Sequence, residues 1–183
     1  MMMGSFDSET PDPVGDVLAA RDAALVQIGF VRRYVLEMLD ATPQELWFEI
    51  PDGFPSCVAW QVGHLAVSQY GLLMFRQRGR QPEDLELIPG RFRKAYGRGS
   101  NPSGDAAKQP SAGELLTRLT EVYEAAIPIA ANRTAEQLGQ ECEMPYAGYA
   151  DCLGAILFCP LHEQLHAGQI GVLRRGLGLE PIR

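Results

Sequence analysis

Apolar residues recur at intervals of three and four positions along four long segments, and this spacing restricts the fold more than any other feature of the chain. Such spacing places the apolar side chains on one face of an amphipathic helix. In the first segment it predicts a helix from Pro13 to about Asp40. In the second segment it predicts a helix from near Ser56 to about Arg78.

Two further segments carry the same pattern together with signals for helix ends. The third predicted helix starts at Ser111, which has Glu114 three residues later in the spacing of a capping box, and its pattern weakens near Pro128. The fourth predicted helix takes Asp151 as its N-cap and ends just before Gly176, which provides the stop.

The connections between these helices restrict the order in which they pack. Residues 79–110 contain five glycines and four prolines, so we expect a long loop with one helical turn around residues 82–87. Residues 132–150 form another connection, with a short turn capped by Thr134 and a break at residues 145–148. No segment shows the alternation of apolar and polar residues that is typical of a β-strand. The four helical segments therefore predict an all-α four-helix bundle. The long loop can cross the whole bundle, so we expect up-down-down-up order with a crossover between the second and third helices.

Composition is typical of a globular domain. For 183 residues, of which 46% are hydrophobic and 21% charged, we expect a disordered tail over residues 1–12 and a single domain over residues 13–183. The formal net charge of −7 argues against nucleic acid as a partner, since Lys and Arg must neutralise its phosphates. No apolar run approaches the ~20 residues that span a bilayer, and no signal peptide is recognised. We therefore expect a cytoplasmic protein without a membrane partner.

The three histidines of the chain carry most of the functional information. His162 and His166 are four residues apart in the fourth predicted helix, so both imidazoles lie on one face and can reach one divalent ion. They belong to a core-facing stripe made of Ala155, Cys159, His162, His166, Gln169 and Leu173. His64 is placed similarly in the second predicted helix, in a stripe made of Trp60, His64, Val67, Gly71 and Met74. Polar side chains in the middle of such a stripe are costly unless they bind a partner.

Each histidine taken alone has a plainer interpretation. A single histidine on an apolar face is more often a hydrogen-bonded core residue than a metal ligand, and the spacing of His162 and His166 alone is as often a coincidence as a site. The three together, with no other histidine in the chain, favour a metal site with open positions for water or substrate. Gln169 is then a candidate hydrogen-bond partner of a ligand, or else a polar residue at the edge of the core.

The segment His162-Glu-Gln-Leu-His166 also matches the H-E-x-x-H motif of zinc proteases, in which the glutamate is the general base. Those enzymes take their third ligand from residues after the motif, but the 17 residues that follow here contain no histidine. A protease is therefore the weaker hypothesis. Glu163 remains a candidate catalytic residue that could move a proton beside a metal ion.

Two motifs make the chain resemble the DinB/YfiT-like family of metal-dependent enzymes. They are Trp60-Gln-Val-Gly-His-Leu-Ala66, and His162-Glu-Gln-Leu-His-Ala-Gly-Gln-Ile170 followed by Leu173-Arg-Arg-Gly-Leu-Gly178. The resemblance covers residues 13–178 and implies an up-down-down-up bundle, zinc or nickel as the ion, frequent homodimers, and metal ligands at His64, His162 and His166. Pro160 departs from a regular helix and is expected to bend its axis just before the ligands.

The same resemblance implies a class of reaction. Characterised relatives include transferases and isomerases that use low-molecular-weight thiols such as mycothiol, bacillithiol or glutathione. We therefore expect a metal-dependent S-transferase or isomerase that acts on a small-molecule substrate with a thiol cosubstrate. The alternatives are a non-catalytic metal- or ligand-binding bundle and, third, a zinc hydrolase that uses the H-E-x-x-H segment. Residues 76–98 carry seven basic side chains against three acidic ones, which either attract an anionic substrate or form a solvated loop.

Overall fold

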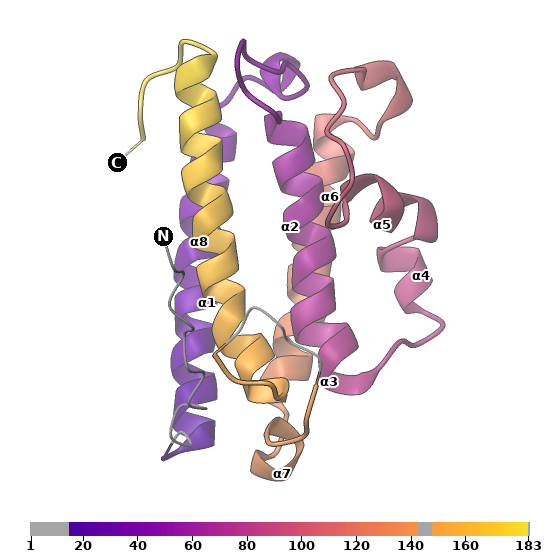
Figure 1. The fold of residues 1–183 in the computed structure, drawn as a ribbon, viewed down its shortest axis with the longest axis vertical. Coiled ribbons are helices and arrows are strands. Elements are labelled where there is room, and N and C mark those ends of the chain that lie inside the picture. Colours follow the sequence, from indigo (N-terminus) through magenta and orange to yellow (C-terminus); the bar gives the residue numbers. More distant parts are fainter. Residues whose placement is uncertain (1–14, 143–147, 183) are drawn as a thin grey trace, which may run out of the picture.

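The computed structural model describes residues 15–142 and 148–182 (Figure 1). Within these residues the regular structure is helical, and the only β-type pairing is a bridge between Glu141 and Asp151. The prediction of an all-α chain is therefore confirmed. The predicted tail over residues 1–12 and most of the predicted break at residues 145–148 lie outside the described residues.

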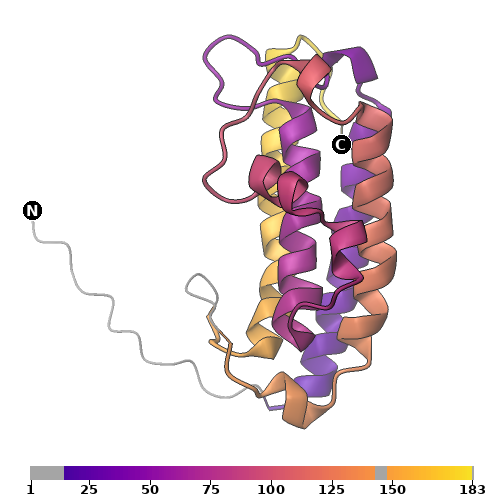
Figure 2. The same cartoon turned by 90° about the vertical axis from the view of Figure 1, so that its right-hand side faces the viewer.

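Four long helical stretches make up most of the structure. They are α1 (Val17–Asp40), α2 (Val58–Tyr70) with its continuation to Arg78, α6 (Ala112–Ala131) and α8 (Cys152–Gly176). α1 packs along α8 and α2 packs along α6, while α2 also contacts α8 and α6 contacts α1, so the four stretches enclose one core. Figure 2 shows that α1 and α8 run towards one end of the molecule, whereas α2 and α6 run towards the end that carries α7.

The beginnings of α6 and α8 follow the sequence signals. The Ser111 hydroxyl accepts a hydrogen bond from the Glu114 N–H at 3.2 Å, and the Glu114 carboxylate accepts one from the Ser111 N–H at 2.8 Å, so the capping box is confirmed. The Asp151 carboxylate caps α8 by accepting from the Gly154 N–H at 2.6 Å. α6 does not stop at Pro128 but continues past it, because the core contacts of its last turn outweigh the local effect of proline.

The end of α8 differs from the prediction. Gly176 is the last helical residue, and Gly178 is the residue with a positive φ, +78°, which favours glycine. The Leu179 N–H donates to the Arg174 carbonyl at 2.9 Å, and the Gly178 N–H donates to the Arg175 carbonyl at 3.0 Å. These two bonds form a Schellman motif, so Gly178 rather than Gly176 terminates the helix.

One turn of the second long stretch contains an extra residue. Residues Gly71–Phe75 form a π turn between α2 and the short α3 (Arg76–Arg78), so the predicted helix is present with one irregular turn. The Arg76 guanidinium donates to the Gly71 carbonyl at 3.1 Å and satisfies an acceptor within this turn. Single π turns inside α-helices occur frequently at functional sites.

The segment 79–110 is more structured than a loop. The predicted turn is present as α4 (Asp84–Leu87), a 3-10 turn spans Ala106–Lys108, and a further helix, α5 (Gly90–Tyr96), packs against α2. α5 was not predicted because only Phe92 and Tyr96 of its seven residues are buried, too few to give a periodic pattern. Their rings contact each other with centroids 4.6 Å apart, and α5 thereby holds the long segment against α2 (Figure 2).

The other connections contain single helical turns. Residues Gln44–Leu46 form a 3-10 turn between α1 and α2. α7 (Ala135–Leu138) lies between α6 and α8, and the Thr134 hydroxyl accepts from the Gln137 N–H at 3.3 Å, as the predicted cap requires.

Candidate metal site

The three histidines come together in the space between α2 and α8. One ring nitrogen from each of His64, His162 and His166 lies within 4.8 Å of the other two. The centroid of the His64 ring lies 5.3 Å from that of His162 and 4.7 Å from that of His166. The centroids of the His162 and His166 rings are 4.5 Å apart. Three imidazole nitrogens this close together are a donor set that one divalent ion such as zinc could share, at a bond length of ~2.1 Å. The donor set therefore fits a metal ion with open coordination positions.

Hydrogen bonds fix which nitrogen of two of the rings faces the site. Nδ1 of His64 lies 2.7 Å from the Tyr96 carbonyl oxygen, and Nδ1 of His166 lies 2.5 Å from Oε1 of Gln61. Gln61 is oriented because its amide nitrogen donates to the Ser56 hydroxyl at 2.9 Å. Since both partners of the histidines are acceptors, each Nδ1 carries the proton and each Nε2 has the lone pair. Nε2 of His64 accepts from the Ser68 hydroxyl at 3.2 Å, a bond that a metal ion at this nitrogen would replace.

The residues around His64 explain why this part of α2 has its sequence. A Cβ on Gly63 would lie 2.3 Å from the Tyr96 ring, so glycine is required for that ring to pack against α2. The close packing brings the Tyr96 carbonyl to His64. On the other side, the Trp60 ring stacks on His64 with centroids 4.7 Å apart, and its indole N–H donates to Ser100 at 3.0 Å.

His162 lies at the more open side of the group. It is half-buried, its ring contacts Phe158 with centroids 5.7 Å apart, and it lines a cavity together with His64. α8 continues through Pro160 without a break, and the rings of His162 and His166 stay adjacent. The irregularity expected at Pro160 therefore does not separate these two ligands.

Burial lowers the pKa of all three imidazoles. For His64 the hydrogen bond to the Tyr96 carbonyl opposes this decrease. Burial, followed by the charge of His64, lowers the pKa of His162 to about 4. Burial and the charges of the other two histidines lower the pKa of His166 to about 3, against the opposing effect of a hydrogen bond with Gln169. All three rings are therefore neutral near pH 7, the state in which they can bind a metal ion.

Glu163 points into a buried ion pair. Nε of Arg32 donates to Oε1 of Glu163 at 2.6 Å, and Nη2 donates to Oε2 at 3.2 Å. The same guanidinium donates to the Leu119 carbonyl and to the Gln69 side chain, both at 3.0 Å. The pair thus connects α1, α8, α6 and α2, and the Glu163 carboxylate is not part of the three-histidine group.

Gln169 is exposed, unlike most residues of the predicted core-facing stripe of α8. Ala155, Cys159, His166 and Leu173 are buried, but Gln169 is exposed. Its hydrogen bond with His166 raises the pKa of that ring and so opposes the larger effect of burial. The buried amide that orients His166 is Gln61, which the sequence argument did not include.

Two other contacts could have been found from the sequence. Gln61 is a polar residue between Trp60 and Val62 in an otherwise apolar stretch, and such a residue needs a buried partner. Arg32 follows Ile28 by four residues and precedes Val35 by three, so it occupies the core-facing stripe of α1. The Tyr96 carbonyl had no comparable signal, because a backbone group depends on the position of α5.

A cavity of about 420 Å³ opens beside the histidines. It is lined by His64, Ser68 and His162, by the π turn, and by the segment that includes α5. A larger cavity of about 860 Å³ lies between α5 and the start of α6, but none of the three histidines lines it. The smaller cavity is the one that could place a ligand beside the proposed metal site.

The described helices include none that is long and apolar enough to cross a membrane. Fold and site together define a helical protein whose core holds a three-histidine group compatible with a divalent metal ion. The model of the DinB superfamily matches residues 27–170, and the chain belongs to this superfamily. The search of curated proteins gave no match.

Proposed function

We propose that His64, His162 and His166 bind one divalent ion, zinc or nickel, and that the protein is a metal-dependent enzyme of S-transferase or isomerase type with a small-molecule thiol cosubstrate. The observation that carries the metal site is the orientation of the rings, because acceptors at Nδ1 of His64 and His166 leave Nε2 for the ion. Membership of the DinB superfamily supports the same assignment.

The residues around the site have separate contributions to this function. Bound to three neutral imidazoles, a divalent ion supplies a Lewis acid that lowers the pKa of a thiol or of water. The Ser68 hydroxyl lines the cavity and donates to Nε2 of His64 at 3.2 Å, so an ion at that nitrogen would release the hydroxyl to hydrogen-bond a substrate. Tyr96 and Gln61 keep two ligand rings in place, and Trp60 covers one face of His64.

Two other functions remain as alternatives. A non-catalytic metal- or ligand-binding bundle would use the same histidines without turnover. A zinc hydrolase that uses Glu163 as its base is the third candidate, and the Arg32 contacts argue against it because both carboxylate oxygens are already bonded. In the proposed enzyme we therefore assign Glu163 a structural role and Gln169 an effect on the pKa of His166.

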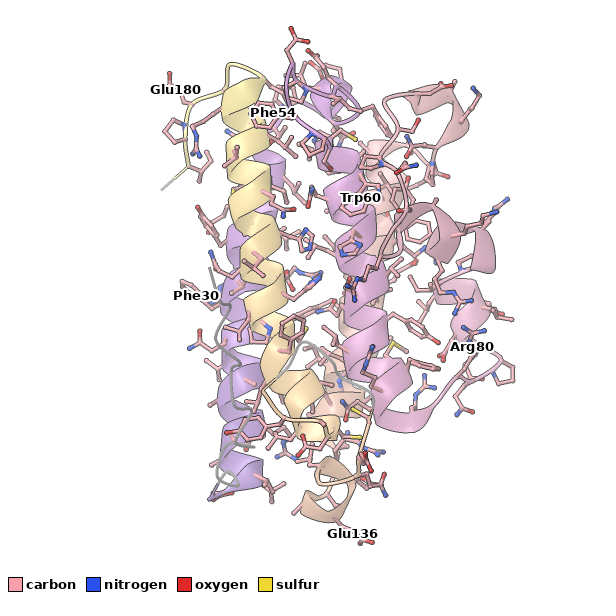
Figure 3. The ribbon with its side chains drawn as sticks, viewed as in Figure 1. Phe30, Phe54, Trp60, Arg80, Glu136 and Glu180 are labelled. Atoms are coloured by element: carbon pink, nitrogen blue, oxygen red, sulfur yellow. The ribbon has the colours of Figure 1, made fainter. Side chains whose placement is uncertain are left out.

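We also propose an order for the four helical stretches and a homodimer. The packing of the four long stretches and their directions in Figure 2 support an up-down-down-up bundle. A homodimer is supported by exposed apolar residues on α1 and α8, two helices that pack against each other: Val26, Phe30, Leu161, Leu165 and Val172. Phe30 projects from the outer side of α1 in Figure 3.

Metal content is the first test. Protein purified without a histidine tag is analysed for bound metals and then titrated with zinc and nickel, with His162→Ala as the variant and Gln164→Ala, an exposed residue of the same helix, as the control. We expect about one ion per chain in the native protein and in the control, and a large loss in the variant. Absence of bound metal together with no rebinding would overturn the metal site.

The second test separates the enzyme from the non-catalytic alternative. The zinc- and nickel-loaded protein is incubated with mycothiol, bacillithiol or glutathione and a panel of electrophiles, and loss of free thiol is followed. We expect consumption of one thiol that stops in His162→Ala. Tight metal binding without consumption of any thiol would favour the non-catalytic bundle.

A further inference from the structure

The cavity beside the histidines has a strongly positive lining. Besides His64 and His162, it is lined by four arginines, Arg76, Arg80, Arg93 and Arg98, and no carboxylate is among the described residues that line it. The whole chain has a formal net charge of −7, so this concentration of positive charge is local. Guanidinium groups in such a number favour ligands that carry a carboxylate or phosphate group.

Asp84, an acidic residue that contacts the lining residue Tyr70, already has its charge compensated. Asp84 is buried, and its carboxylate accepts from Arg78 at 2.7 Å, from the Tyr70 hydroxyl at 3.1 Å and from the Gln81 N–H at 2.9 Å. Burial opposes these bonds, yet together they keep the pKa of Asp84 below its ordinary value. The partner of Asp84 in this ion pair, Arg78, is not among the residues that line the cavity, and Arg80 hydrogen-bonds the Tyr70 hydroxyl within the lining.

The arginines and the histidines are positioned by the same elements. Arg93 is on α5 one turn before Tyr96, the residue whose carbonyl bonds His64. Arg76 follows the π turn of the helical stretch that carries His64, and Arg80 lies just beyond α3 (Figure 3). A ligand held by the arginines is therefore held at a fixed position relative to the histidines.

We propose that this cavity binds the anionic group of the substrate, a carboxylate or phosphate of a small organic molecule, through Arg80 and Arg93, with the remainder of the molecule directed to His64 and His162. The inference deepens the proposed function and rests on it. The volume of about 420 Å³ is that of a site for a small molecule. A planar guanidinium binds both oxygens of a carboxylate or phosphate, which gives orientation as well as attraction.

The test is calorimetric titration of the zinc-loaded and the metal-free protein with inorganic phosphate, with succinate and with the neutral succinamide. The variants are Arg93→Gln and Arg80→Gln, and the control is Arg175→Gln, which removes an exposed positive charge from the last turn of α8. Arg76 is left intact because its bond to Gly71 supports the π turn.

We expect saturable binding of one anion and none of succinamide. Each cavity variant should weaken binding about tenfold or more, as loss of a charged hydrogen-bond donor does, while Arg175→Gln leaves it unchanged. Preference for phosphate or for succinate identifies which oxyanion the cavity takes. Binding should also weaken as the salt concentration rises.

Two results would overturn the proposal. One is the absence of saturable binding of either anion, and the other is binding that Arg93→Gln and Arg80→Gln do not change. Zinc content is measured on the same samples: a protein that takes up no zinc contradicts the proposed function, whereas anion binding in the metal-free samples still tests the arginines by themselves.

Discussion

The backbone carbonyl of Tyr96 accepts a hydrogen bond from Nδ1 of His64 at 2.7 Å, so a residue of the long segment between α2 and α6 orients a proposed metal ligand on α2. The contact depends on the packing of the Tyr96 ring against Gly63. Metal binding at the proposed site would therefore depend on the folding of the 79–110 segment, and variants of this segment should affect both.

Gly63→Ala should lower both stability and metal affinity. Its Cβ would lie 2.3 Å from the Tyr96 ring, so α5 must shift and the carbonyl leaves His64. We expect a decrease of about 1–3 kcal/mol in the free energy of unfolding and a loss of about 10–100-fold in zinc affinity. Urea denaturation and competitive zinc titration measure the two effects. Gly168→Ala on α8 is the control, because a Cβ at that position would have no neighbouring side chain within 4 Å. Unchanged zinc affinity in Gly63→Ala would show that Tyr96 does not orient His64.

Gln61→Leu should weaken metal binding while the helices remain folded. The substitution removes the acceptor for Nδ1 of His166, which then loses its fixed orientation. Loss of such a partner typically reduces metal affinity about 10–100-fold. Gln61→Glu keeps an acceptor and should recover most of the affinity. Equal zinc affinities of the native protein and Gln61→Leu, measured by competition with a chelator, would contradict this role.

Glu163→Gln should destabilise the fold far more than it affects metal content. The substitution leaves the buried Arg32 guanidinium without its counter-charge, and breaking such a pair costs about 3–5 kcal/mol. The double variant Arg32→Met/Glu163→Leu should recover part of this loss. Unfolding in urea measures stability, and metal analysis is run on the same samples. If Glu163→Gln kept native stability but abolished thiol consumption, Glu163 would be a catalytic residue instead.

The metal-free protein should lose stability as the pH falls below 6.5. The pKa values of His162 and His166 in the folded protein are lowered to about 4 and about 3, so the unfolded chain binds protons first. Their contribution is complete above pH 6.5 and decreases towards those folded-state values, by at most about 1.4 kcal/mol per histidine per pH unit. Urea midpoints measured between pH 7.5 and 5 test this. The double variant His162→Gln/His166→Gln should show a smaller decrease over the same range.

The proposed homodimer should dissociate when charge is placed on the exposed face of α8. Leu161 and Leu165 are each 63% exposed and lie one turn apart. Leu161→Glu/Leu165→Glu should convert a dimer to a monomer, because carboxylates are not tolerated in an apolar interface without partners. Light scattering after size exclusion gives the mass, and Gln164→Glu is the control on the same helix. A native protein that is already monomeric would contradict the proposal.

The long helices were predictable because each buries a periodic stripe, and the caps at Ser111 and Asp151 gave their starting points. Short elements were not predictable in the same way. α5 buries only two side chains, and its position depends on the space that Gly63 leaves beside α2. The end of α8 differs from the prediction because two glycines lie close together there, Gly176 as the last helical residue and Gly178 beyond it, and the hydrogen bonds of the last turn select Gly178.

The histidine group was predictable in identity but not in orientation. His64, His162 and His166 lie among apolar residues at helical spacing, which indicated that they face the core. The structure brings their ring nitrogens together. Which nitrogen faces the site depends on Gln61 and on a backbone carbonyl distant in sequence. Glu163 shows the opposite case, since its motif suggested a base while Arg32, 131 residues away, holds its carboxylate.

The π turn at Gly71–Phe75 sets the angular phase between the two halves of its helical stretch. Residues twelve positions apart on a regular α-helix point about 120° apart, and the extra residue of a π turn removes much of that difference. His64 and Arg76 are separated by twelve positions and line the same cavity. If the same residues formed a regular α-helix instead, the Arg76 guanidinium would point about 120° away from the His64 imidazole, so the wide turn is what lets both groups face one molecule in the cavity.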